Sequence, residues 1–245
     1  MLEPALFLIP VTLGDTPIEQ VLPAYNKEVI LGIRHFIVEN VRSARRFLKK
    51  VDAGIDIDGL HFCELNQHTD RRVIDSYLDP LLQGSPVGII SEAGCPAVAD
   101  PGADVVAIAQ RRGLRVVPLV GPSSIILSVM ASGFNGQSFA FHGYLPIDEA
   151  GRVQRLRQLE ARIYSEDQTQ LFIETPYRNL KLMQTLVQVL RPQTRISLAA
   201  DITCPDESIR TRTASEWKRL LGAARSDDER QKLVPRCPAI FLIYK

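Results

Sequence analysis

Short apolar runs alternate with stretches of helical periodicity through the first half of the chain. The apolar runs, which we predict to be strands, are Ala5–Ile9, His35–Val38, His61–Leu65, Val87–Ser91 and Val116–Val120. The predicted helices between them are Val41–Lys50, Arg71–Leu82 and Asp104–Arg111. Strands that alternate with helices predict βαβ units and a mostly parallel sheet. Because these strands are apolar almost throughout, we expect helices on both faces of that sheet.

The first half ends with a predicted helix from Ser123 to about Ala131, whose apolar residues 125–131 we expect to be buried. Gly133 to Gln137 then interrupt the pattern, which places the boundary between an N-terminal α/β lobe (1–135) and a C-terminal α/β lobe (136–245). Predicted strands are Ser138–Gly143, Gln170–Thr175, Arg195–Ala200 and Ala239–Tyr244, with helices at Gly151–Tyr164, Arg178–Leu190 and around Trp217. Charged and β-branched residues alternate over Glu207–Thr213, which predicts an antiparallel strand and hence a mixed sheet. The charge-dense segment Ala224–Lys232 predicts a solvated loop or a helix end.

Composition narrows the class of protein. The 245 residues are 45% hydrophobic and 23% charged, with a net charge of +1, which excludes a disordered chain and a strongly basic histone-like binder. No apolar stretch approaches the ~20 residues that a bilayer requires, so we expect no membrane partner. The first residues lack the basic segment of a signal peptide, and the four cysteines form no CxxC pair. These features favour a cytoplasmic protein with free thiols and without a metal site.

Four loops that follow predicted strands are rich in glycine, proline, serine and acidic residues. They are Pro10–Asp15, Ser91–Gly102, Gly121–Ser124 and Gly143–Pro146. In open parallel sheets ligands bind beyond the carboxyl ends of the strands, so these loops predict a shared ligand site. The chain contains neither G-x-G-x-x-G after a strand nor a P-loop, and neither H-E-x-x-H nor G-x-S-x-G, which disfavours dehydrogenases, NTPases, zinc proteases and α/β-hydrolases.

Taken in order, SEAGCPAVADPG (91–102), LVGPSSIILSVMASGF (119–134), FHGYLP (141–146) and FIETPYR (172–178) form a recognisable series. The series resembles the tetrapyrrole methylase superfamily of S-adenosylmethionine-dependent methyltransferases. Within that superfamily it is most similar to the branch that methylates ribose 2′-oxygens of 16S ribosomal RNA, the RsmI type. The resemblance covers about residues 6 to 201.

The resemblance implies a two-lobed α/β fold, an N-terminal mostly parallel sheet, a C-terminal mixed sheet and a cofactor cleft between the lobes, usually in a homodimer. It implies S-adenosylmethionine as cofactor and ribosomal RNA or the 30S subunit as partner. Carried over by position, the residues expected to bind the cofactor are Ser91, Ala93, Gly94, Cys95, Pro96, Val98, Asp100, Gly121, Ser123, Ser124, Phe172, Ile173, Pro238 and Ala239.

Methyl transfer to a ribose hydroxyl needs a group that accepts the hydroxyl proton. Glu39, Glu92, Glu174 and Asp201 are the candidates for this base or for orienting the substrate. Arg42, Arg45 and Arg178 are candidate substrate-binding residues, and Arg46 lies on the same predicted helix as the first two.

The chain departs from the branch in three segments. Its first loop reads Val11-Thr12-Leu13-Gly14-Asp15, Asn40 replaces an aspartate, and Ala200–Cys204 lacks an arginine and a lysine of the family pattern. Two alternatives therefore stay open beside the RNA enzyme. One is a small-molecule methyltransferase of tetrapyrrole type, and the other is a non-catalytic relative that binds the cofactor or serves as an interaction module.

Overall fold

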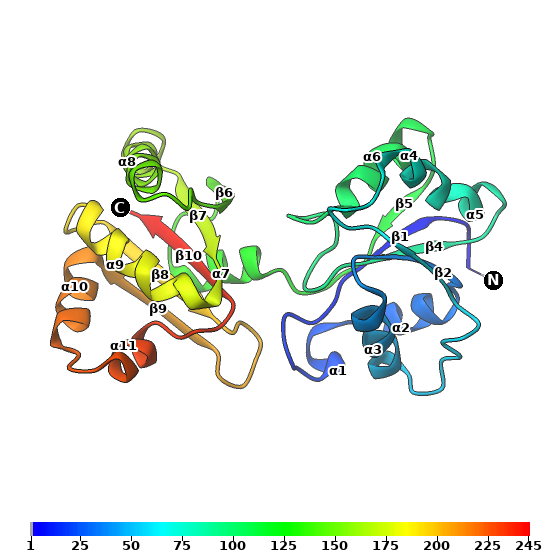
Figure 1. Cartoon of the computed structure of the whole chain (residues 1–245), viewed down its shortest axis with the longest axis horizontal. Coiled ribbons are helices and arrows are strands. Elements are labelled where there is room, and N and C mark those ends of the chain that lie inside the picture. The colour runs from blue at the N-terminus through cyan, green and yellow to red at the C-terminus, as the bar shows by residue number, and fades with distance from the viewer. Residues whose placement is uncertain (1) are drawn as a thin grey trace. The chain divides into compact units, whose positions relative to one another are not determined.

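The computed structural model describes residues 2–245, which form two compact units (Figure 1). The first unit extends to Ser123 and the second runs from Ser124 to Lys245. This division lies ahead of residue 135, because the helix α7 (Ser124–Ser132) packs on the sheet of the second unit. Within residues 2–245, no helix is both long enough and apolar enough to cross a membrane.

The first unit contains a sheet in which all neighbouring strands are parallel, as the sequence predicted. The strand order is β3-β2-β4-β1-β5. The strands are β1 (Leu6–Ile9), β2 (His35–Val38), β3 (His61–Glu64), β4 (Val87–Ile90) and β5 (Val116–Pro118). In the central pairs, Ile90 of β4 is opposite both Ile9 of β1 and Val38 of β2, so these three strands end at one level.

Helices cover both faces of this sheet, as the apolar strands predicted (Figure 1). One face carries α1 (Ile18–Val21), α2 (Ala24–Leu31) and α3 (Val41–Val51), and the other carries α4 (Arg71–Ile74), η1 (Asp75–Leu78), α5 (Asp79–Leu82) and α6 (Gly102–Arg111). The prediction of one continuous helix over Arg71–Leu82 was wrong, because the segment forms three short turns. Pro80 lies in the first turn of the last of them, where its missing N–H costs no helical hydrogen bond.

The second unit contains the mixed sheet that the sequence predicted, in the order β6-β7-β10-β8-β9. Its strands are β6 (Phe139–Tyr144), β7 (Thr169–Glu174), β8 (Arg195–Ala200), β9 (Ser208–Thr213) and β10 (Ala239–Tyr244). Strands β6 and β7 are parallel, and the remaining neighbours are antiparallel. The predicted antiparallel pairing of Glu207–Thr213 is confirmed by β8 and β9.

The helices of the second unit are α7, α8 (Glu149–Glu166), η2 (Pro176–Arg178), α9 (Asn179–Val189), α10 (Ala214–Ala223) and α11 (Asp227–Leu233). The expectation that residues 125–131 are buried was wrong in part. Met130 is 72% exposed, because α7 turns the small side chains of Ser128 and Ser132 toward the unit's interior. Most of the segment expected as a solvated loop or helix end is α11, which Ser226 caps by accepting a hydrogen bond from the Glu229 N–H.

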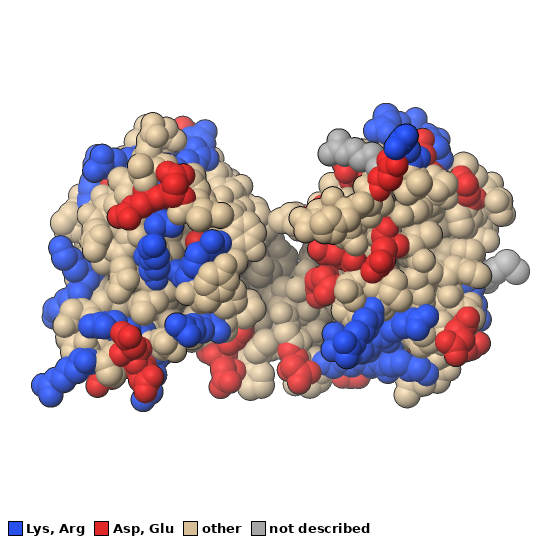
Figure 2. All heavy atoms as spheres, in the orientation of Figure 1, with Lys and Arg blue, Asp and Glu red and all other residues tan. Residues whose placement is uncertain are grey.

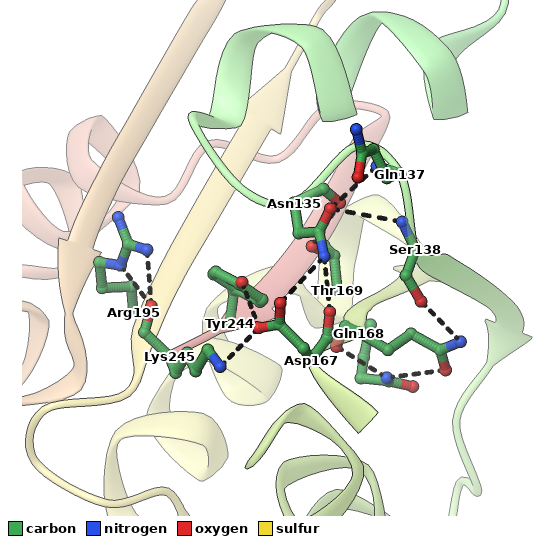
Figure 3. A network of polar contacts seen from close by, with 10 residues as sticks. Asn135, Gln137, Ser138, Asp167, Gln168, Thr169, Arg195, Tyr244 and Lys245 are labelled. Atoms are coloured by element: carbon green, nitrogen blue, oxygen red, sulfur yellow. Dashed lines mark hydrogen bonds and ion pairs between the residues drawn. The ribbon is translucent and has the colours of Figure 1, made fainter. Parts of the chain in front are cut away.

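A polar network joins the end of β10 to the loops beside β7 (Figure 3). The Asp167 carboxylate accepts a hydrogen bond from the Tyr244 hydroxyl at 2.6 Å and pairs with the Lys245 ammonium. These two donors hold the pKa of Asp167 below its usual range. Asn135 donates to the Asp167 carbonyl oxygen at 2.7 Å. Asp167, which has a left-handed backbone conformation, therefore links the end of α8 to the loop before β6 and to the end of β10.

Trp217 anchors the core of the second unit, and its removal gives a direct test of that core. The side chain is fully buried, and its indole N–H donates to the Ile196 carbonyl oxygen at 3.0 Å. Trp217→Ala is expected to lower the free energy of unfolding by about 3–5 kcal/mol, through the cavity and the lost hydrogen bond. Tyr177→Ala, at a 68% exposed position, should change it by less than about 0.5 kcal/mol. Urea denaturation followed by circular dichroism measures both, and equal effects would contradict this core.

Candidate functional site

The carboxyl ends of β1, β2, β4 and β5 bring four loops to one edge of the first unit's sheet. We call this the first-unit edge, and it comprises residues 10–15, 39–40, 91–102 and 119–123. Two backbone hydrogen bonds join the first and third loops, from Val11 N–H to the Gly94 oxygen at 2.9 Å and back at 3.2 Å. Three of the four predicted loops, 10–15, 91–102 and the turn at Gly121, thus follow strands at this edge, whereas the fourth, Gly143–Pro146, lies in the second unit.

The loop 91–102 is held in an unusual backbone conformation. Gly94, Ala97 and Ala99 all have positive φ, at 70°, 65° and 59°. Alanine in the left-handed region is strained, and such strain is concentrated at ligand-binding segments. The Asp100 carboxylate holds the loop in place by accepting the N–H groups of Ala97 and Gly102, each at 2.8 Å.

The turn at Gly121 lies against the first loop without room for a side chain. A Cβ atom at Gly121 would lie 2.3 Å from the Cβ and Cγ atoms of Pro10. The adjacent Pro122 oxygen accepts a hydrogen bond from the Cys95 thiol at 3.4 Å, which links this turn to the loop 91–102. Ser123 and Ser124 follow at the division between the two units, and Ser124 begins α7.

Three carboxylates are gathered at the first-unit edge. Glu39 follows β2, Glu92 follows β4, and Asp100 lies ahead of α6. Burial raises the pKa of Glu39, and the negative charges of Glu92 and Asp100 raise it further. Burial also raises the pKa of Asp100, against the opposing effect of its two N–H donors. Glu39 and Asp100 line a common cavity of about 10 Å³, which is about the least that one water molecule needs.

Helix α3 begins beside these carboxylates and carries the candidate substrate-binding arginines. Asn40 caps it by accepting the N–H groups of Arg42 at 2.9 Å and Ser43 at 3.1 Å. The replacement of aspartate by Asn40 therefore keeps the cap and removes one negative charge. The Ser43 hydroxyl donates to Glu92, which fixes that carboxylate against α3. Arg42 and Arg45 are both exposed, and the Arg45 guanidinium lies over the Phe62 ring at 5.5 Å.

At the end of β7 in the second unit, the Glu174 carboxylate already has hydrogen-bond partners. Its Oε1 atom accepts hydrogen bonds from the Thr175 N–H at 2.7 Å and from Arg178 Nε at 2.8 Å. Arg178 Nη2 lies 2.7 Å from the same oxygen, and the Glu174 side chain is only 5% exposed. The Glu174 carboxylate is therefore already paired, and its partner Arg178 is partly buried.

The neighbouring strand ends of the second unit bring Asp201 to Pro238. The Asp201 N–H donates to the Pro238 oxygen at 3.0 Å, and Ala239 pairs with both Glu174 and Ala200. Asp201 has a positive φ of 47° and accepts a hydrogen bond from the Cys237 thiol. Burial, together with Asp201, raises the pKa of that thiol to about 12, so Cys237 is a neutral thiol at physiological pH.

The structure groups the predicted residues into two sets, one in each unit. The first-unit edge unites the residues from 91 to 100, Glu92 among them, with Gly121 and Glu39, while the second set unites Glu174, Arg178, Asp201, Pro238 and Ala239. Phe172 has a fully buried side chain in the core, stacked on Phe241, so this side chain does not face a ligand. Ile173 pairs with Ile240 within the sheet. Within residues 2–245, no group of three His, Cys, Asp or Glu side chains is placed to hold a metal ion.

Sequence reasoning missed Ser43 and Lys50. Nothing in the sequence pairs Ser43 with Glu92, which is 49 residues away. Lys50 had a usable signal, because Arg42, Arg46 and Lys50 recur every four residues and therefore lie along one stripe of α3.

Comparison with known proteins shows the fold first. The methyltransferase CobJ superposes with a TM-score of 0.61 over 98% of this chain and 94% of its own, at 13% identity. Uroporphyrin-III C-methyltransferase from Thermus thermophilus, complexed with S-adenosyl homocysteine, gives 0.55 over 98% and 97%, at 16% identity. The expected tetrapyrrole methylase-like fold is thus confirmed.

Sequence relatives define the family. Ribosomal RNA small subunit methyltransferase I of Mesorhizobium japonicum is 30% identical over 212 residues, covering 86% of this chain and 68% of that protein. The enzyme of the same name from Vibrio cholerae is 28% identical over 229 residues, covering 94% and 74%. No family model matches the chain. The chain belongs to the ribosomal RNA small subunit methyltransferase I family, as its motifs led us to expect.

The raised pKa of Glu39 makes a prediction about stability. A carboxyl whose pKa is higher in the folded than in the unfolded state favours folding when protonated, and this contribution is lost as the pH rises through the folded pKa. Glu39→Gln should therefore stabilise the protein at neutral pH and give no gain below the ordinary glutamate pKa. Melting temperatures measured across this pH range test the prediction. A gain of equal size at both ends of the range would contradict the crowding of carboxylates.

Proposed function

We propose that this chain is an S-adenosylmethionine-dependent methyltransferase that methylates a ribose 2′-oxygen of small-subunit ribosomal RNA. The family carries the proposal, because relatives named as small-subunit ribosomal RNA methyltransferases match up to 94% of the chain. The first-unit edge supports it, because the loops that the family motifs predicted for the cofactor converge there.

The chemistry of the first-unit edge suits the proposed cofactor. S-adenosylmethionine supplies an electrophilic methyl group on a positively charged sulfur. Glu39, Glu92 and Asp100 give the edge negative charge, and burial together with the charges of Glu92 and Asp100 raises the pKa of Glu39. The loop 91–102 is held by hydrogen bonds and contains the small residues Gly94, Ala97 and Ala99, so its backbone is open to close approach by a ligand.

Glu39 is the candidate base that the structure favours. A general base works best when its pKa lies close to the working pH, and the pKa of Glu39 is shifted upward in that direction. Glu174 is bound to Arg178, and Asp201 accepts from the Cys237 thiol, so both carboxylates have other partners. In our proposal Glu39 accepts the ribose proton, Glu92 orients the substrate, and exposed Arg42 and Arg45 contact RNA phosphates.

We also propose a homodimer in the cytoplasm. The second unit exposes the large apolar side chains of Met130 on α7 and Tyr144 on the edge strand β6, which a second subunit could bury. All four cysteines are free of disulfides, in keeping with a reducing compartment. The tetrapyrrole enzyme and the non-catalytic relative are the alternatives that the experiments below separate.

Gly121 gives a test of cofactor placement. In Gly121→Val the new side chain must displace Pro10, which should weaken S-adenosylmethionine binding by at least about tenfold, or about 1.4 kcal/mol. Isothermal titration calorimetry measures the affinity, and Gly222→Val is the matched control because a Cβ there meets open space. Circular dichroism establishes that both variants are folded. Unchanged binding by Gly121→Val would place the cofactor elsewhere, and no binding by the wild type would favour the non-catalytic alternative.

Mass spectrometry of ribosomal RNA from cells with and without the protein tests the acceptor. We expect one ribose methylation of the small subunit to be lost with the protein and restored by the wild-type chain. Glu39→Gln should slow transfer by about 10²–10⁴-fold and fail to restore the mark in full, although we expect it to be the more stable protein. Unchanged RNA modification would reject ribosomal RNA as the acceptor and leave the small-molecule alternative.

A further inference from the structure

A second cavity lies wholly within the first unit, between the first loop and helix α3. Its volume is about 390 Å³, within the range of small-ligand pockets. Residues 11–15 form one wall, α3 forms the other, and Glu92 is at its border with the first-unit edge. We call it the α3 pocket, and neither the cofactor motifs nor the proposed base accounts for it.

Two cations of the α3 pocket come from one stripe of the helix. Arg46 and Lys50 both line the pocket and are both exposed. Lys50 pairs with Asp15 of the opposite wall at 3.0 Å, and the Asp15 side chain is fully exposed to solvent. No ion pair or hydrogen bond to another residue of the described chain 2–245 is found for the Arg46 guanidinium. Figure 2 shows basic side chains gathered over α3, so an approaching anion meets a positive surface here.

Where Glu92 borders the pocket, the lining is negatively charged. The Ser43 hydroxyl donates to Glu92 Oε1, which fixes the carboxylate and leaves Oε2 available as an acceptor. A carboxylate accepts hydrogen bonds and repels phosphate, so it suits a sugar hydroxyl. The pocket thus offers cations for a phosphate and a fixed acceptor for a hydroxyl, which is the pattern of a ribonucleotide.

We propose that the α3 pocket binds one nucleotide of single-stranded RNA, with Arg46 and Lys50 on its phosphate and Glu92 accepting a hydrogen bond from its 2′-hydroxyl. The inference rests on the proposed function and adds the place where this chain distinguishes RNA from DNA. The phosphate displaces Asp15 from Lys50, because two negative groups compete for one ammonium.

The first test measures the salt dependence of binding to a short fluorescent single-stranded RNA by anisotropy. Arg46→Gln and Lys50→Gln should each reduce the slope of log K against log salt by about 0.7, the loss of one phosphate contact. Lys49→Gln is the matched control, because this change removes the same charge from the same helix. The Lys49 ammonium donates to the Ala53 oxygen and does not line the pocket. Equal effects from all three variants, or no RNA binding by the wild type, would overturn the proposal.

A gain of affinity provides a test that misfolding cannot imitate. Asp15→Asn should tighten RNA binding, since it frees Lys50 and removes the competing carboxylate. Asp58→Asn, on an exposed loop that does not line the pocket, controls for the change in net charge. Tighter binding by Asp15→Asn alone supports the proposal, and an equal gain by both variants contradicts it.

The sugar preference tests the role of Glu92. Wild-type protein should bind the RNA more tightly than DNA of the same sequence, and Glu92→Ala should remove most of this preference. A preference that persists in Glu92→Ala would reject the contact with the 2′-hydroxyl. These measurements need neither cofactor nor methyl transfer, so a failed methylation assay with normal RNA binding would reject the proposed function alone.

Discussion

The parallel pairing of β4 between β1 and β2 is the constraint on which the candidate site depends. Because Ile90 is level with both Ile9 and Val38, the segments that follow must leave the sheet at one edge. Residues far apart in the sequence thereby become neighbours. Because the strands end together, Val11 of the first loop forms backbone hydrogen bonds with Gly94. For the same reason the negative charge of Glu92 raises the pKa of Glu39.

Negative charge at that edge is costly to the free protein and suited to its proposed partners. Burial and like charges raise the pKa of Glu39, and a positively charged ligand beside it would lower that pKa. A positively charged cofactor favours the ionised carboxylates, while the basic stripe of α3 favours an anionic RNA. The two charges are kept apart on neighbouring faces, with Ser43 holding Glu92 between them.

The second unit shows how a similar set of residues can serve structure. Glu174 and Arg178 pair in a largely buried site, and Phe172 stacks within the core. Motif position alone assigned these residues to cofactor, substrate and catalysis. The hydrogen bonds of Glu174 and the burial of Phe172 show which of their atoms already have partners, and this separates candidate chemistry from packing.

The sequence by itself determined the element types, the parallel and mixed sheets and the family, because hydrophobic periodicity and loop motifs are local properties. It predicted β2, β8 and β10 at their observed bounds. It misjudged Arg71–Leu82 and the exposure of Met130, since a local pattern does not say where a helix is interrupted or which face finds a partner. Only the tertiary structure decided that Ser43 meets Glu92 and that Lys50 faces Asp15, because these contacts depend on strand order and helix rotation, which residues distant in sequence set together.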